Sequence, residues 1–436
     1  MARVDEDKLN LAEVSAIGIG GMIGGGIFAV LGLAIATAGH AVALTLAGGG
    51  VIALLTGLSY AHLGLHFRGD GGSFTYIEKA FAAPLIAGCA GWLLVVGYVG
   101  TLALYATAFA DYGATLLGHG GAQPVTAVLA ALVLVGFLGI NLRGARTSGG
   151  IELGVVAIKL LILAVFAAAG LIGIKADHFV PLFDRGVASP LVAVALIFVA
   201  YEGFELIPNA IDEMADPARN LRRAIVIAVV LTTVIYIVVA VAALGNLTPA
   251  QIQQDQEYVL AVAARPTLGQ AGFVLIGIAA LLSTASAINA TLFGAARLAM
   301  VMAREHALPQ VFALQERSRP VPYVSLLALT GLSIAFALAA PLAAISGFAS
   351  ATFLVIFAAV NFSALRLAGR IGLSPLIPLA GGILATASLG LLLWHDWQTD
   401  RASLYLLLAV YGTVVAFEIV LTVRRGHRPL GPCPVQ

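Results

Sequence analysis

Charged side chains are scarce in this chain. Only 10% of its 436 residues are Asp, Glu, Lys or Arg, whereas 60% are hydrophobic. Soluble domains carry about 25% charged residues, so the composition excludes an ordinary soluble protein and predicts one that crosses a membrane several times. The formal net charge is +1, and the sequence has no long basic run. We therefore expect a lipid bilayer, and no nucleic acid, as a partner.

Cysteine is also rare. The two cysteines, Cys89 and Cys433, predict neither a disulfide framework nor a metal site. The eight histidines are scattered, and the sequence has no Ser-His-Asp arrangement and no phosphate-binding loop. We therefore expect no enzyme activity, no cofactor and no bound metal ion. A cleaved signal peptide is not expected either, because the apolar run behind the polar first ten residues lacks a small-residue cleavage site followed by a soluble domain.

Long apolar stretches dominate the sequence instead. Twelve of them approach the length of about 20 residues that a spanning helix needs. They lie near 11–38, 41–66, 84–117, 124–142, 151–174, 189–211, 221–245, 270–304, 321–340, 343–367, 373–395 and 402–424.

The orientation follows from the basic residues, because lysine and arginine are retained on the cytoplasmic side. If the N-terminus lies in the cytoplasm, only four of the lysines and arginines lie on the outer side of the membrane: Lys175, Arg185, Arg265 and Arg401. The sequence therefore predicts a multi-pass protein of the plasma membrane with both termini in the cytoplasm.

Two of these stretches contain residues that interrupt helices. Five glycines fall within Gly20–Phe28 in the first stretch, and Glu202, Gly203, Glu205 and Pro208 fall in the sixth. Glycine weakens a helix by up to about 1 kcal/mol relative to alanine, and proline removes a donor. Broken helices in lipid offer free N–H groups to an anion and free carbonyls to a cation. The alternative is that the first-span glycines serve only close helix packing.

The positions of the two interruptions predict a repeat. They are five spans apart, so the second unit enters the membrane from the opposite side. We expect an all-α membrane protein with an inverted repeat of five plus five spans and an added two-helix hairpin. The units would be residues 1–174, 175–370 and 371–436. This prediction rests on hydropathy and on the paired interruptions, because the halves show no residue-level similarity.

Three motifs resemble a known transporter family. Gly21–Phe28 resembles the first-span signature of amino acid–polyamine–organocation (APC) transporters, Phe198–Glu205 their sixth-span signature, and Asp212–Ile225 the segment that follows. Asp216 stands where the family usually has asparagine, Arg222 where it usually has proline, and Glu202 where it more often has an apolar residue. The resemblance implies the LeuT-type fold, with spans 1, 3, 6, 8 and 10 around a central site, and coupling to a sodium ion or a proton.

Lys159 in the fifth span bears on which ion is used. A buried lysine has a lowered proton affinity, so it can exchange a proton near neutral pH. A proton-coupled branch of the family resembles this sequence in placing lysine here. Gly20 would offer carbonyls nearby, and Ser283 and Ser286 would be hydroxyl partners. The alternative is that Lys159 extends to the cytoplasmic headgroups.

The two interruptions together predict the substrate site. The N–H groups of glycines 24–26 would hold a carboxylate, and the main-chain carbonyls of Met22, Ile23, Val199 and Ala200 would meet the amine. Tyr201 is a candidate lid, Glu202 a contact for a cationic group, and Glu205 a gating or proton-relay group. Both carboxylates could instead bond only to loose backbone. The predicted substrate contacts are Met22, Ile23, Gly24, Gly25, Gly26, Val199, Ala200, Tyr201, Glu202 and Gly203.

We therefore predict a proton-coupled secondary active transporter of amino acids or related amines, working by alternating access. Two alternatives share the fold. One is a sodium-independent exchanger of amino acids or polyamines, and the other is an ion carrier or channel.

Overall fold

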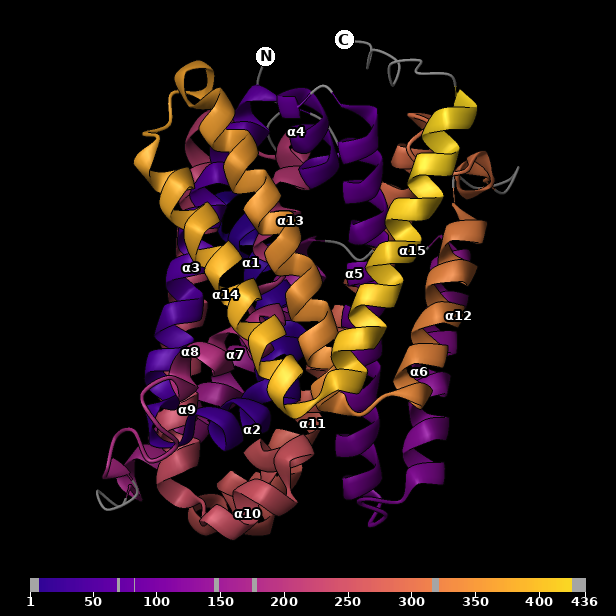
Figure 1. Cartoon of the computed structure of the whole chain (residues 1–436). Helices are drawn as coiled ribbons and strands as arrows, with labels where there is room; N and C mark the ends of the chain where they lie inside the picture. The colour runs from indigo at the N-terminus through magenta and orange to yellow at the C-terminus, as the bar shows by residue number, and fades with distance from the viewer. Residues whose placement is uncertain are drawn as a thin grey trace.

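The computed structural model describes residues 8–68, 71–81, 83–144, 149–174, 179–315 and 321–425. Lys175 and Cys433, used above, lie outside these ranges. The described residues form a bundle of helices, and their only β-type pairing is an isolated bridge between Leu9 and Met214. Figure 1 shows that the start of the first helix and the end of the last described helix lie at the same end of this bundle.

The helices follow one another with short connections. The N-terminal half contains α1 (Leu11–Gly21), η1 (Met22–Gly26), α2 (Ile27–Ala38), η2 (Gly39–Ala41), α3 (Val42–His66), α4 (Gly72–Phe81), α5 (Pro84–Leu116), α6 (Gln123–Leu142) and α7 (Gly149–Ile172). The rest contains α8 (Ser189–Ile197), η4 (Phe198–Tyr201), η5 (Phe204–Glu213), α9 (Pro217–Asn246), α10 (Pro249–Gln254), η6 (Gln256–Tyr258), α11 (Val259–Arg304), η7 (Gln310–Ala313), α12 (Tyr323–Ala339), α13 (Leu342–Ile371), α14 (Leu376–Thr399) and α15 (Arg401–Arg425).

These helices agree with a membrane-spanning chain. Within the described ranges, 10 helical segments are long and apolar enough to cross a membrane; one runs from Leu11 to His66, through the short turn η2, and α12 is a shorter apolar helix. Helix lies over each of the twelve expected stretches. The number of complete crossings, and the inverted repeat, stay predictions.

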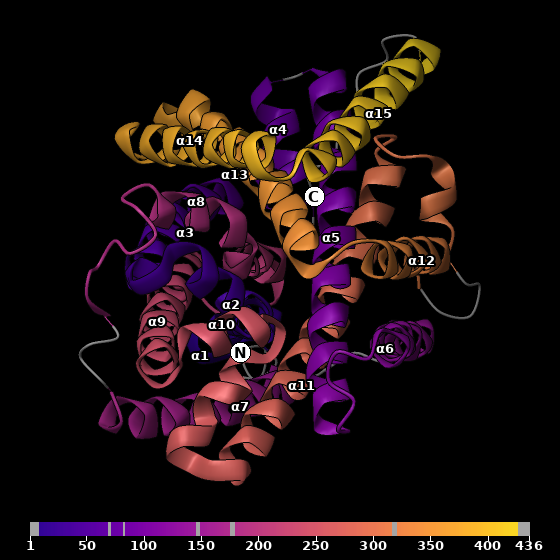
Figure 2. The ribbon, with the colours of Figure 1, turned by 60° about the horizontal axis from the view of Figure 1, so that its bottom comes forward.

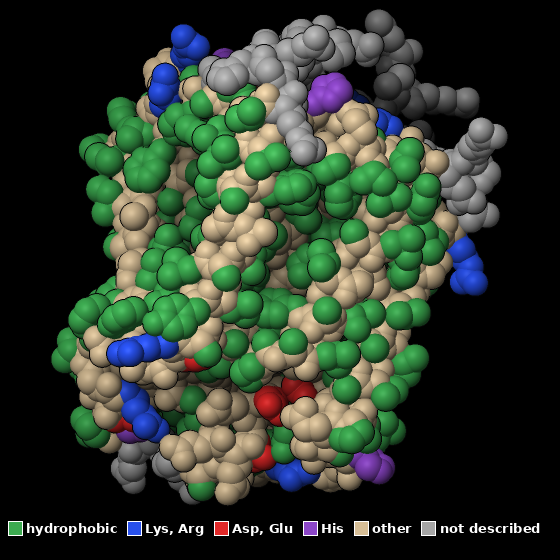
Figure 3. Space-filling model, turned by 45° about the vertical axis from the view of Figure 1, so that its right-hand side comes forward, with side chains coloured by type: hydrophobic (Ala, Val, Ile, Leu, Met, Phe, Trp, Pro, Cys, Tyr) green, Lys and Arg blue, Asp and Glu red, His purple; other side chains and the backbone are tan. Residues whose placement is uncertain are grey.

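The bundle has a buried centre and an apolar outside. In the segment Ser189–Glu213, 83% of the most apolar stretch of 18 residues is buried inside the protein. The corresponding share is 22% in α6 and 17% in α15. Figure 2 shows α6, α12 and α15 at the edge of the bundle. Hydrophobic side chains cover most of the middle of the face drawn in Figure 3. Exposed apolar side chains on peripheral helices suit contact with lipid.

The first expected interruption takes a different form from the one predicted. The chain stays helical from Leu11 to Ala38, but the five residues Met22–Gly26 form a π-helical turn. The helix therefore does not divide into two halves with separate ends, and the expectation of a broken first helix is corrected. The cause lies in the glycines, which allow this wider turn to pack closely against neighbouring helices, as described below.

The sixth stretch is broken, as the sequence predicts. Helix α8 passes into the 3-10 turn η4, Glu202 is extended (φ −62°, ψ 139°), and Gly203 has φ 130°. The chain then continues as the 3-10 helix η5, which contains Pro208. Because L-residues rarely adopt φ near 130°, glycine is required at position 203.

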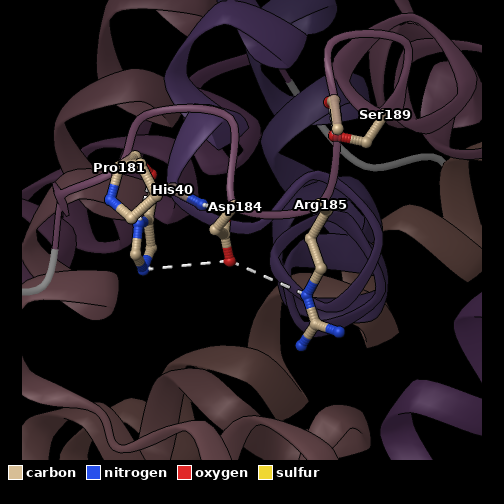
Figure 4. Close-up of polar contacts among 6 residues, drawn as sticks. His40, Pro181, Asp184, Arg185 and Ser189 are labelled. Atoms are coloured by element: carbon tan, nitrogen blue, oxygen red, sulfur yellow. Dashed lines mark hydrogen bonds and ion pairs between the residues drawn. The ribbon is translucent and has the colours of Figure 1, made fainter.

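A polar cluster ties two loops together at the end of the bundle opposite the start of α1 and the end of α15. Asp184 accepts a hydrogen bond from the His40 N–H at 2.9 Å, and His40 Nδ1 lies 2.8 Å from the Pro181 carbonyl oxygen. Arg185 Nε lies 3.7 Å from Asp184 Oδ2. Figure 4 shows the His40 and Arg185 side chains on either side of Asp184, each joined to its carboxylate by a dashed line. The turn between α2 and α3 is thus fixed to the loop that precedes α8.

Candidate functional site

The two interruptions meet in the centre of the bundle. A Cβ built on Gly203 would lie 2.7 Å from the Met22 nitrogen, and one built on Gly21 would lie 2.9 Å from the Gly203 Cα. Such distances leave no room for a side chain at either position. The π-helical turn and the break in the sixth stretch therefore touch backbone to backbone; that they form one substrate site stays a prediction.

The glycines of the π-helical turn are covered in this conformation. A Cβ on Gly24 would lie 2.6 Å from the Ala287 Cβ, and one on Gly25 would overlap the ring of Tyr105. One on Gly26 would lie 2.7 Å from the Ala200 carbonyl oxygen. Close packing, the alternative considered above, thus accounts for these glycines here. A substrate reaching Gly25 needs a conformation in which Tyr105 has moved.

Tyr236 of α9 joins both interruptions. Its hydroxyl lies 2.6 Å from the Met22 carbonyl oxygen and 2.9 Å from the Ala200 carbonyl oxygen, with geometry for donation to both. These are two of the carbonyls that the sequence assigned to the substrate amine. Tyr236 itself was missed, although a tyrosine in an otherwise aliphatic stretch, just after Thr232 and Thr233, is a visible signal.

The Glu202 carboxylate is buried and held by a neighbouring helix. Thr101 of α5 donates a hydrogen bond to Glu202 Oε2 at 2.5 Å, and Glu202 is 3% exposed. The Glu202 N–H donates to the Val199 carbonyl at 3.0 Å. Glu202 therefore bonds to a side chain of another helix and not only to the loose backbone of the break. Thr101 was not predicted, because threonines are frequent in apolar helices.

Tyr201 points toward α3. Its hydroxyl donates to the Leu46 carbonyl at 2.5 Å, and its ring would lie 2.6 Å from a Cβ built on Gly49. Its ring also contacts that of Tyr236, with centroids 5.5 Å apart. A role for Tyr201 as a lid over substrate requires the bond to Leu46 to break.

Glu205 lies after the break, in the first turn of η5. Its Oε2 accepts a hydrogen bond from the Gly203 N–H at 2.7 Å, so it satisfies backbone that the break leaves free. Its Oε1 has no hydrogen-bond partner among the described residues, and the side chain is buried. Oε2 therefore binds the local backbone, and Oε1 is available to accept a proton or a hydrogen bond.

Lys159 is enclosed by protein. Its side chain is 1% exposed, and helix α7 packs against α1, α9 and α11. It does not extend to the surface, so the snorkelling alternative is wrong for this conformation. Gly20 on α1 and Ser283 on α11 are buried, and Ser286 is half-buried. The fold thus brings together the helices that carry the predicted proton-coupling residues.

An all-helical bundle whose first and sixth segments are interrupted at a shared central junction defines a membrane transporter of the LeuT-type fold. Residues 9–393 match the family described as amino acid permease. The chain belongs to this family, whose members are transporters and not enzymes.

Two relatives and one solved structure support this assignment. An uncharacterized protein of Methanocaldococcus jannaschii is 34% identical over 95% of both chains. The inner membrane transport protein YbaT of Escherichia coli is 29% identical, covering 96% of this chain and 97% of its own. The solved structure of a manganese transporter from Eremococcus coleocola superposes with a TM-score of 0.62 at 12% identity, covering 95% of this chain and 93% of its own. At that identity the structure supports the fold alone.

Proposed function

We propose that this permease is a proton-coupled secondary active transporter of amino acids or related amines in the plasma membrane, with both termini in the cytoplasm. It works by alternating access between two inverted repeats. The observation that carries the proposal is the burial of Lys159. A lysine ammonium buried on α7, a helix that packs against α1, α9 and α11, is costly unless the neighbouring helices compensate its charge.

Proton exchange at Lys159 supplies the coupling. A bound ammonium ties α7 to α1 and α11, as a sodium ion would in that position. Loss of the proton removes one charge and releases this tie, so protonation favours one conformation over the other by its differential interaction with them. A fixed cation in this pocket also disfavours binding of sodium there.

The substrate binds at the junction of the two interruptions. The carbonyls of Met22 and Ala200 already receive a donor, the Tyr236 hydroxyl, and an ammonium group is a stronger donor for the same oxygens. The N–H groups of glycines 24–26 hold the substrate carboxylate once Tyr105 uncovers Gly25. Glu202 lies buried at the same junction, where it selects or senses a positive group.

Glu205 passes protons between the junction and the end of the bundle that carries both termini. Its bond to the Gly203 N–H fixes the carboxylate at the break, and its second oxygen is available. A carboxylate with one committed and one available oxygen can take up and release a proton without losing its position.

Uptake into proteoliposomes tests the proposal. The purified protein is reconstituted in sodium-free buffer with an alkaline interior and an acidic exterior, and uptake of labelled neutral and cationic amino acids is measured. We expect accumulation above the external concentration only while the pH gradient is present. Uptake that depends on preloaded amino acid and ignores the gradient would instead identify an exchanger. An absolute sodium requirement would contradict proton coupling.

A further inference from the structure

Three arginines lie exposed at the start of α9. Arg219, Arg222 and Arg223 fall within the first seven residues of this helix, at spacings that place them on one face. No carboxylate oxygen of the described residues lies within ion-pair distance of their guanidinium groups, although Glu213 and Asp216 are close in sequence. Cations at the positive end of a helix are unfavourable. An anion at this position would therefore be stabilised both by the arginine side chains and by the positive end of the helix dipole.

Two surface grooves adjoin these arginines, and both are lined by Arg222 and Arg223. The first, of about 400 Å³, is also lined by Arg219 and by His62 and Leu65 of α3. The second, of about 480 Å³, is completed by apolar side chains: Leu11, Val226 and Ile227. A cationic groove thus continues into an apolar one.

The face that carries the arginines continues as apolar surface along α9. Ile227 is 41% exposed, Val230 44% and Val234 51%. From Arg219 to Val234 the helix rises about 22 Å at 1.5 Å per residue. Positive charge at the end of the span, followed by exposed aliphatic side chains within it, matches the order of groups along a phospholipid.

We propose that these grooves bind an anionic phospholipid of the leaflet on the side of both termini. The arginines hold its phosphate, and an acyl chain lies along Val226, Ile227 and Val230. Guanidinium groups pair with phosphate through two parallel hydrogen bonds, and basic pockets between spans at a membrane surface suit acidic headgroups. A soluble phosphate would use the first groove only, so the apolar groove favours the lipid.

The site involves helices that also build the transport junction. Leu11 begins α1, which leads into the π-helical turn, and Leu9 is joined to the segment before α9 by hydrogen bonds to Glu213 and Ala215 of 2.8 and 2.9 Å. Arg222 stands where the APC pattern usually has proline, so this cation is a feature of this sequence. The proposal does not depend on the transported substrate.

Native mass spectrometry of the full-length protein tests the site. The protein is purified in detergent and titrated with phosphatidylglycerol, phosphatidylcholine or inorganic phosphate. The variant Arg222→Ala/Arg223→Ala removes the shared cations. Arg370→Ala, which removes an exposed arginine in the last turn of α13, is the matched control. Val226→Asn tests the apolar groove, and the melting temperature of each lipid-free variant shows that it is folded.

The parent protein should bind phosphatidylglycerol more tightly than phosphatidylcholine. The double variant should lose about 25-fold in phosphatidylglycerol affinity, since each arginine near acidic lipid contributes roughly fivefold, and Arg370→Ala should lose little. Val226→Asn should weaken the binding of phosphatidylglycerol and leave the binding of inorganic phosphate unchanged. Equal binding of the two lipids, full retention by the double variant, or displacement of the lipid by equimolar inorganic phosphate would each overturn the proposal.

Discussion

The Tyr236 hydroxyl lies 2.6 Å from the carbonyl oxygen of Met22, in the π-helical turn of the first segment. The same hydroxyl reaches the Ala200 carbonyl in the break of the sixth segment at 2.9 Å. One side chain on α9 therefore connects the two interrupted segments. Since a hydroxyl has a single hydrogen, the two carbonyls share one donor, and an ammonium group could replace it.

Removal of the Tyr236 hydroxyl should destabilise the junction of the two interrupted segments. Tyr236→Phe keeps the buried ring but leaves two buried carbonyls without this donor, at an expected cost of about 1–3 kcal/mol. The melting temperature in detergent should fall. Tyr405→Phe is the control, because Tyr405 is 56% exposed on α15, and it should melt like the parent. Identical melting of all three proteins would show that the bond contributes nothing to this conformation.

Alanine at position 203 should prevent normal assembly of the junction. An L-residue is strained by roughly 1–3 kcal/mol at unfavourable backbone angles, and the Cβ would also lie 2.7 Å from the Met22 nitrogen. Gly203→Ala should therefore lower both folded yield and uptake. Gly136→Ala provides the comparison, because a Cβ there meets nothing within 4 Å. Wild-type yield and uptake for Gly203→Ala would refute the described contact.

The hydroxyl of Thr101 should matter more than its shape. Thr101→Val removes the donor to the buried Glu202 carboxyl group and keeps the volume, so uptake should fall severalfold by loss of a hydrogen bond of about 0.5–1.5 kcal/mol. Thr101→Ser retains the hydroxyl and should recover most of the uptake. If valine and serine behave alike, the bond seen at 2.5 Å has no functional part.

Gly25 and Tyr105 should be energetically coupled. A Cβ at position 25 overlaps the Tyr105 ring, so Gly25→Ala should destabilise the conformation described here. The same change should cost less when Tyr105 is already alanine. A double-mutant cycle on thermal stability measures this coupling, expected at about 0.5–3 kcal/mol. Additive effects would mean that the ring does not cover Gly25.

The sequence predicted the position of the junction because its causes are local. Gly203 and Pro208 cannot continue an ordinary helix, and the glycines of the first segment permit a wider turn. The form of the first interruption was not predictable, because a π-helical turn and a break use the same glycine-rich composition. Packing against Ala287, Tyr105 and Ala200 accompanies the turn observed here.

The partners of the junction were missed for a different reason. Thr101 and Tyr236 lie on helices far away in the sequence, and neither belongs to a motif. Their roles depend on how α5 and α9 are placed against the two interruptions, which is a property of the tertiary fold. Lys159 could be proposed from the sequence because a lysine within an apolar span is conspicuous by itself; its part in coupling stays a prediction.

The most direct test of the account is the response of Lys159 variants to a pH gradient. In sodium-free proteoliposomes with an acidic exterior, the parent should accumulate substrate, and so should Lys79→Ala, which removes an exposed lysine of α4. Lys159→Ala should only equilibrate substrate, and Lys159→Arg should also fail to accumulate it, since arginine keeps its proton. Full gradient-driven accumulation by Lys159→Ala would contradict the proposed coupling.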